Sequence, residues 1–400
     1  MFGNTTYPDL QQYWFIIISL LGGLLVFFFS VQGGCNFSFG PEKTAGERPG
    51  STAGERPGST AGEKKGNTIG ERTENTAGER TLPTNGPGGK GLFTLAMLVA
   101  FAGTFFASFP LFYATSFGGA YWLWMLILFA FVIRALSCEI RRVAVSVPVT
   151  RICEGSLFIG SMAGTVLLGV VLATFFSGSP FSLSEMNSVV WGNSGRGLEA
   201  VLSVFNLSLG LAFFFLARVM GLQYFVRTSD DDSTISHSRK QLLYNVIPFL
   251  FFFLFFFIWL MLREGYAVDP DTGEVFMESR KYLHNLLEMT PVLVIFLTGV
   301  TGILGGIILS LVRQNSYGIW LTGTGTVLMV FSLFMLAGFN HTAFYPSSTD
   351  LQSSLTIGNA SSSRYTLEVL SYGSLFLPVV IVYGAIAWRV MNKKPHMTDL

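Results

Sequence analysis

Charged residues are scarce in this sequence. Asp, Glu, Lys and Arg make up 12% of its 400 residues, whereas roughly 25% is usual for soluble proteins. Hydrophobic residues make up 50%, and they fall in blocks about as long as a membrane span. These values exclude an ordinary soluble protein with a single core. The net charge is +1 and the basic residues are scattered among loops, which also excludes a nucleic-acid-binding surface.

Cysteine and histidine are too few and too scattered to predict a metal centre. The three cysteines form no CxxC pair and no even-numbered disulfide framework. No histidine falls in an apolar block, so no two can bind a haem between facing helices. The 13 methionines leave an alternative set of ligands, but Met in a packed span more often fills gaps. The four histidines are His237, His284, His341 and His396. HExxH motifs and Gly-rich phosphate loops are also missing. We therefore expect no cofactor and no metal on this chain, and any redox cofactor on another one.

Nine blocks of the sequence can cross a membrane. A helix needs about 20 apolar residues to span the hydrocarbon core, where it satisfies its own backbone hydrogen bonds. The predicted spans are 13–31, 92–114, 119–136, 156–177, 200–221, 242–262, 291–312, 319–339 and 367–390. We expect only Pro248 and Pro378 to interrupt them. The predicted fold class is therefore all-α: residues 1–400 form a single polytopic membrane domain with nine transmembrane helices.

The distribution of basic residues predicts the orientation. With the N-terminus outside, 20 of the 25 Lys and Arg residues fall in cytoplasmic segments and five fall in outer ones. Cytoplasmic loops carry the excess of Lys and Arg in membrane proteins. An odd number of spans then places the C-terminus in the cytoplasm.

Residues 41–90 are a tandem repeat between the first two predicted spans. Units of the type TAGERPGS recur every eight residues from Thr44 to Thr76. Eight residues are too few for a solenoid unit, and the units hold too little apolar surface to order themselves. We expect a disordered cytoplasmic loop, and the alternative is a docking segment for a partner.

Ionisable side chains are rare in the predicted spans, where each is costly and a candidate for function. Arg134 lies near the cytoplasmic end of the third span and is followed by Glu139 and Arg141. One interpretation is an interface residue that snorkels or forms an ion pair, and the other is a functional site. Glu199 and Glu288 stand at span entrances, where a helix N-terminus stabilises a carboxylate, so we expect both to act as caps.

Two patterns indicate packing. Gly-xxx-Gly spacings at 160–164 and 302–306 allow close approach of helices. The predicted outer segment 340–364 is dense in Ser, Thr and Asn, which suit turns and caps that bond their own backbone.

Three groups of motifs resemble subunit II of cytochrome bd quinol oxidases. One is FFASFPLFYA at 105–114 in the second span, and another is the spacing of Arg134, Glu139 and Arg141 after the third. The remaining group precedes the last span and comprises PSST at 346–349, SLT at 354–356 and NASS at 359–362, with Pro346, Ser347, Ser348 and Asn359 as candidate functional or structural residues.

This resemblance implies a partner, subunit I, which carries haems b and d, oxidises quinol from the quinol pool and reduces oxygen to water. The present chain would be the haem-free subunit of this oxidoreductase in the cytoplasmic (inner) membrane of a bacterium. In that family, subunit II scaffolds subunit I and has a place in oxygen access and proton delivery. Some members hold a structural quinone or bind small accessory membrane subunits.

Two departures from the family pattern count against a proton route through this chain. Gln32 stands where many members carry an acid, and Gly91-Leu92 stand where they carry Trp and an acid. Two alternatives stay open. One is a stand-alone secondary transporter of a small apolar or neutral solute, although a proton-driven transporter needs a titratable group near the midplane. The other is a degenerate subunit that inserts but no longer supports turnover.

Overall fold

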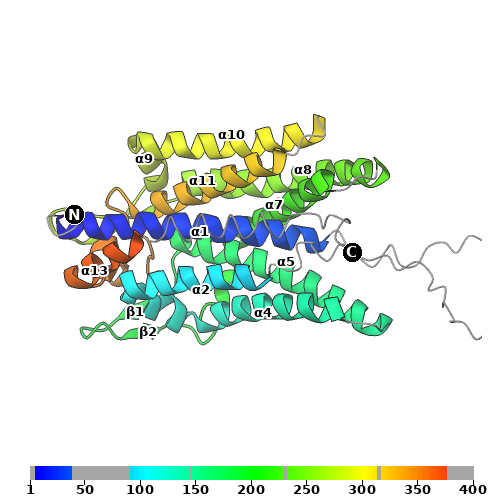
Figure 1. Ribbon diagram of the computed structural model, residues 1–400. Helices are drawn as coiled ribbons and strands as arrows, with labels where there is room; N and C mark the ends of the chain where they lie inside the picture. Colours follow the sequence, from blue (N-terminus) through cyan, green and yellow to red (C-terminus); the bar gives the residue numbers. More distant parts are fainter. Residues whose placement is uncertain (1–4, 38–90, 144–145, 229–231, 313–316, 376–400) are drawn as a thin grey trace, which may run out of the picture.

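The computed structural model describes residues 5–37, 91–143, 146–228, 232–312 and 317–375, which form a bundle of long helices (Figure 1). Seven helices in these residues are long and apolar enough to cross a membrane. They are α1 (Tyr7–Phe37), α4 (Tyr121–Val143), α5 (Val147–Ser177), α7 (Val204–Thr228), α8 (Asp232–Leu262), α10 (Thr290–Val312) and α11 (Gly318–Gly338). The repeat at 41–90 lies outside the described residues.

The seven helices correspond to seven of the nine predicted spans. Several continue beyond the apolar block because polar residues at their ends keep the helical hydrogen bonds; α8, for example, starts ten residues before its predicted span at 242–262. The ninth predicted span, 367–390, begins within α13 (Arg364–Ser374), and its remainder, with Pro378, lies outside the described residues. The described part of the chain therefore supports a multi-pass helical membrane protein.

The second predicted span, 92–114, is not a single straight helix. It consists of α2 (Gly91–Ser108), the short α3 (Pro110–Phe112) and the π-helical turn η3 (Tyr113–Gly119), with a bend of 118° at the break. Proline lacks a backbone N–H and disfavours a helical conformation in the residue before it, and Phe109 has φ −131°. The expectation about prolines was thus wrong: Pro110 breaks a helix, whereas α8 runs through Pro248.

Short elements gather at the end of the bundle where α1 begins, called the hairpin end below (Figure 1). Two antiparallel hairpins lie there, β1 (Phe181–Leu183) with β2 (Val189–Trp191) and β3 (Gly265–Val268) with β4 (Val275–Glu278). The other short elements are α6 (Glu199–Leu202), α9 (Lys281–Glu288), η4 (Leu351–Ser353) and α12 (Ile357–Ala360). The all-α prediction therefore holds for the spans and fails for these connections.

Glycines bring the long helices into close contact. A Cβ on Gly160 would lie 2.9 Å from the carbonyl oxygen of Ala130 in α4, and one on Gly306 would lie 2.6 Å from that of Gly318 in α11. Both Gly-xxx-Gly spacings thus face a neighbouring helix, as predicted from the need for small residues at membrane helix contacts.

An aromatic layer fills the bundle toward the hairpin end. Its rings are at most 1% exposed, and neighbouring ring centroids are 4.2–6.4 Å apart, a range that favours edge-to-face and offset contacts. The layer consists of Phe15, Phe105, Phe109, Phe112, Phe175, Phe344 and Tyr345.

Candidate functional site

The candidate residues before the last helix lie at the hairpin end, and Ser347 is at their centre. Its side chain is fully buried. The hydroxyl donates to the Phe181 carbonyl oxygen and accepts from the backbone N–H groups of Asp350 (3.1 Å) and Thr349 (3.3 Å). The Ser347 N–H donates to the Ser354 hydroxyl at 3.0 Å. The Ser347 side chain therefore holds one turn of residues 340–364, called the hydroxyl-rich segment below, against strand β1.

The neighbours of Ser347 act through their backbone. The Ser179 N–H donates to the Pro346 carbonyl oxygen, and the Ser348 N–H donates to the Ser179 carbonyl oxygen, each at 3.0 Å. Pro346 is buried, but the Ser348 side chain is exposed. Within this motif, Ser347 therefore has a buried hydroxyl and Ser348 has an exposed one.

Asn359 organises the next turn. It forms a capping box with Thr356, in which the Thr356 N–H donates to Asn359 Oδ1 (2.8 Å) and the Asn359 N–H donates to Thr356 Oγ1 (3.1 Å). Asn359 Nδ2 also donates to the Ser354 carbonyl oxygen at 3.0 Å. The dense hydroxyl and amide groups therefore satisfy backbone groups, as the composition predicts.

The first helix is tied to the same segment. Gln11 Nε2 donates to Ser361 Oγ at 2.5 Å, and the Tyr7 hydroxyl donates to the Ser362 carbonyl oxygen at 2.8 Å. Further along α1, Trp14 Nε1 donates to the Leu367 carbonyl oxygen of α13 at 3.1 Å. These bonds join the N-terminal turns of α1 to the start of the last predicted span.

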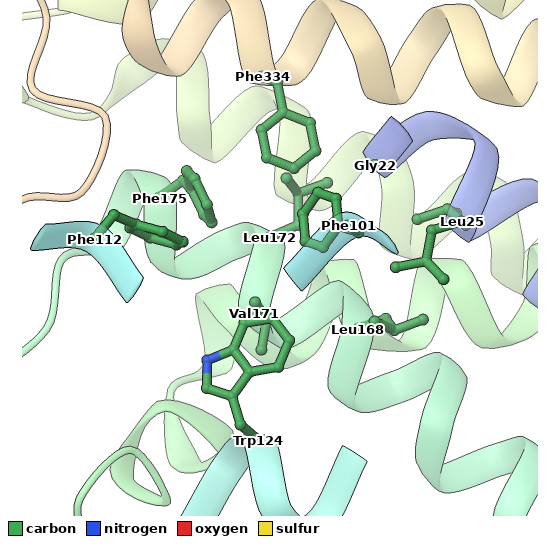
Figure 2. A pocket seen from close by; sticks show the side chains of 11 residues that line it. Gly22, Leu25, Phe101, Phe112, Trp124, Leu168, Val171, Leu172, Phe175 and Phe334 are labelled. Carbon is green, nitrogen blue, oxygen red and sulfur yellow. The ribbon is translucent and has the colours of Figure 1, made fainter. Parts of the chain in front are cut away.

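An apolar cavity of about 30 Å³ adjoins the aromatic layer (Figure 2). It is surrounded by helices α1, α2, α4, α5 and α11 and by the short α3. Its lining consists of Gly22, Leu25, Val26, Phe101, Phe112, Trp124, Leu168, Val171, Leu172, Phe175 and Phe334.

The side chains that line this cavity present almost only carbon atoms. Trp124 carries the one polar side-chain atom in its lining, and the indole N–H already donates to Ser116 Oγ at 3.0 Å. Water in a cavity needs two to four polar partners, and cavities lined by apolar side chains stay dry and bind apolar molecules such as xenon. The cavity is therefore suited to a small apolar molecule.

The remaining candidates lie toward the opposite end. Gln32 is 3% exposed, and its Oε1 accepts a hydrogen bond from Thr94 Oγ1, which joins α1 to α2. Arg141 forms an ion pair with Glu154 of α5 at 3.0 Å, whereas Glu139 is exposed.

The Arg134 side chain is buried within the bundle. It is 2% exposed, and its guanidinium carbon lies 4.2 Å from the centroid of the Phe29 ring. A cation over an aromatic face is attracted by the ring quadrupole. Gly160 makes room for this pair, since its Cβ would lie 3.4 Å from Arg134 Cβ.

Sequence reasoning missed one intramembrane cation and wrongly predicted two acids as helix caps. Arg218 lies within the predicted span 200–221, and its Nε donates to Asn245 Oδ1 of α8 at 2.6 Å. A single Arg in an apolar block was the available signal. Glu288 ends α9 and accepts from Asn340 Nδ2 at 2.6 Å, so it is not an N-terminal cap. Glu199 accepts the N–H of Gly197 at 3.1 Å, but Gly197 precedes α6 and the N-cap of that helix has no side-chain bond, so Glu199 is not an N-terminal cap either.

The comparisons with known proteins decide the family. The family model for cytochrome bd terminal oxidase subunit II matches residues 80–391. This chain belongs to that family. Its place in an oxidoreductase complex, and in a membrane, follows from the family and from the apolar helices.

Relatives of this subunit II chain share about a quarter of its residues. It is 26% identical over 314 residues to the probable cytochrome oxidase subunit 2 of Haemophilus influenzae, a match that covers 74% of this chain and 78% of the relative. It is 24% identical over 311 residues to the cytochrome bd-I ubiquinol oxidase subunit 2 of Escherichia coli, covering 74% and 80%. It is also 26% identical over 316 residues to the cytochrome bd ubiquinol oxidase subunit 2 of Bacillus subtilis, covering 74% and 81%.

The fold is also found among solved structures. A chain from the structure of the bd oxidase from Geobacillus thermodenitrificans matches with a TM-score of 0.54 and 10% identity, over 97% of both chains. At this level of identity the likeness concerns the fold.

The three described histidines are not placed to bind a haem between helices. His237 and His341 are exposed, and the His284 side chain is 50% exposed and bonded to Glu278. An axial ligand would have to project into the interior between helices. In the described ranges there is also no group of three or more His, Cys, Asp or Glu residues placed to bind a metal ion.

Proposed function

We propose that this chain is the haem-free subunit II of a quinol:oxygen oxidoreductase of the cytochrome bd type in the inner membrane of a bacterium. Its family membership supports this function, and so do the exposed positions of the three described histidines. Haems b and d, which carry electrons from quinol to oxygen, would belong to subunit I. A structural quinone and small accessory subunits stay predictions from the family resemblance.

The scaffolding role rests on how the chain is tied together. Hydrogen bonds from α1 to the hydroxyl-rich segment, and from that segment to β1, join the two ends of the described chain at the hairpin end. A bundle fixed in this way presents one rigid surface to subunit I. Gln32 carries a neutral amide that cannot take up a proton from water, so we propose no proton uptake at that position.

The carbon-lined cavity is the observation that carries a second role, in oxygen access. Dioxygen is small and apolar, and the cavity offers it space without hydrogen-bonding groups that water would need. We propose that the cavity holds dioxygen within the bundle and so raises its local concentration near subunit I.

A cavity-filling substitution tests this role. Leu172→Phe adds a ring at the cavity wall, and we expect it to raise the KM for oxygen while kcat at saturating oxygen stays unchanged (Figure 2). Leu254→Phe is the matched control, because Leu254 is 49% exposed on α8. Overpacking costs about 1–3 kcal/mol, so the haem-to-protein ratio of the complex must be measured for both. An unchanged oxygen dependence in an intact Leu172→Phe complex would contradict the role.

We propose nine spans with the hairpin end outside, which the excess of basic residues in the other segments supports. The transporter alternative has little support. Acidic residues in the described long helices lie within eight residues of a helix end, whereas a proton-coupled transporter needs one near the midplane. The degenerate-subunit alternative predicts that the purified complex has no quinol oxidase activity.

A further inference from the structure

Arg263 follows the last turn of α8 at the hairpin end. Its backbone N–H donates to the Trp259 carbonyl oxygen at 3.0 Å, so the helical spacing continues and the two side chains lie on one side of the helix. Both contact the ring of Phe205 in α7. The guanidinium carbon of Arg263 lies 5.0 Å from the ring centroid, and the Trp259 ring meets Phe205 edge-on at 5.6 Å. These three side chains therefore form one cluster between α7 and α8.

The Arg263 guanidinium has more hydrogen-bond donors than the protein uses. Nη2 donates to the Ser177 carbonyl oxygen at 3.3 Å, and the Tyr266 hydroxyl is a second partner. An arginine carries five N–H donors, so three are left for an acceptor from elsewhere. No carboxylate in the described ranges forms an ion pair with Arg263. Glu264, the next residue, is exposed to solvent, where salt screens its charge.

Apolar side chains surround this cation. Leu262 is 61% exposed, and Leu202 and Val204, which precede Phe205, are 84% and 62% exposed. Trp259 is 40% exposed, and tryptophan is enriched where the hydrocarbon of a bilayer meets the headgroups. This end of α8 therefore has the composition of a membrane–water boundary, which is the level of the lipid phosphates.

The exposed face of α8 next to this end suits lipid better than another helix. Phe251, Leu254 and Ile258 are 49–63% exposed, and their spacing of three and four residues places them on one face. Contacts between membrane helices are enriched in small residues that let backbones approach, whereas these three side chains are large. Residues 246–262 also include no charged residue. Acyl chains can therefore cover this face without leaving a charge unpaired in the hydrocarbon.

We propose that Arg263 binds the phosphate of an anionic phospholipid whose acyl chains lie along the exposed face of α8. The planar guanidinium can donate two parallel hydrogen bonds to two phosphate oxygens. The Phe205 ring and the Ser177 carbonyl oxygen hold it in place, so little side-chain freedom is lost on binding. A lipid with a net negative charge is favoured over a zwitterionic one, whose ammonium group brings a second positive charge toward Arg263.

Photo-crosslinking in nanodiscs tests the site. The assembled complex carries the photoreactive residue p-benzoylphenylalanine in place of Leu262, and the bilayer holds equal amounts of phosphatidylglycerol and phosphatidylcholine. One basic residue near a membrane surface favours anionic lipid by about fivefold. We therefore expect mass spectra to show the phosphatidylglycerol adduct in about fivefold excess over the phosphatidylcholine adduct.

Two arginine variants show whether the excess depends on Arg263. Arg263→Gln should bring the two adducts to parity. Arg280→Gln should keep the excess, and it is the matched control because Arg280 is an exposed arginine at the same end of the bundle. Size-exclusion chromatography checks that each complex is assembled.

Two outcomes in the complex with native Arg263 would overturn the proposal, and neither needs a variant of the site. One is equal amounts of the two lipid adducts. The other is a crosslink from position 262 to a protein of the complex instead of a lipid, because another subunit would then cover this face.

Discussion

Removal of the Ser347 hydroxyl should destabilise the hairpin end more than any other single-atom change in the hydroxyl-rich segment. Ser347→Ala deletes one donated and two accepted hydrogen bonds and leaves the Phe181 carbonyl oxygen and the N–H of Asp350 without that partner. A buried group left unsatisfied costs about 1–3 kcal/mol. Because the Thr349 bond is long, we count two such groups and expect a loss of about 2–6 kcal/mol.

The adjacent residue is the control. Ser348 differs from Ser347 by one position, but its side chain is exposed, so Ser348→Ala should stay within about 0.5 kcal/mol of wild type. The assay is the thermal unfolding midpoint of the assembled complex in detergent, followed by size-exclusion chromatography after heating. Equal midpoints for Ser347→Ala and Ser348→Ala would refute the assignment of the buried hydrogen bonds to Ser347.

Two further predictions concern pH and orientation. Burial raises the pKa of Tyr282, so the folded state keeps a proton that the unfolded chain loses above about pH 10. The stability of the folded protein should therefore fall as pH rises beyond that value, and Tyr282→Phe should weaken this pH dependence. Unfolding midpoints measured between about pH 9 and 11 check this prediction. An exposed cysteine introduced by Asp271→Cys should react with an impermeant thiol reagent added to intact cells, and protection there with reaction only after lysis would reverse the orientation. The native Cys138 and Cys153 are 4% and 5% exposed, so they should stay unlabelled from either side and serve as the background control.

The sequence predicted the long helices well because apolar length is a local property. Prediction from the sequence failed where a helix break or the burial of a side chain depends on packing against distant segments. Pro110 and Pro248 both lie in predicted spans, yet only Pro110 ends a helix, and no local signal distinguishes them. Ser347 and Ser348 likewise share one motif but differ in burial. Their difference depends on the position of β1, whose Phe181 lies 166 residues before Ser347 in the chain.

The candidate site could be predicted from the sequence where it depends on local composition, and not where it depends on packing between distant segments. The density of hydroxyl groups at 340–364 indicated side-chain bonds to backbone, which the structure confirms. The apolar cavity could not be predicted, because its lining comes from segments between Gly22 and Phe334 whose rings leave a space only when packed together. Arg134 and Arg218 were visible as charges in apolar blocks, but their partners Phe29 and Asn245 lie on other helices.

The visible absorption spectrum of the purified protein, recorded for this chain expressed alone and for the complex with its co-purified partner, tests most directly whether it is a haem-free subunit of an oxidase. The chain alone should show no Soret band. The complex should show the bands of haems b and d and should consume oxygen with quinol as the electron donor. Stoichiometric haem bound to the isolated chain would contradict the assignment of all haems to the partner.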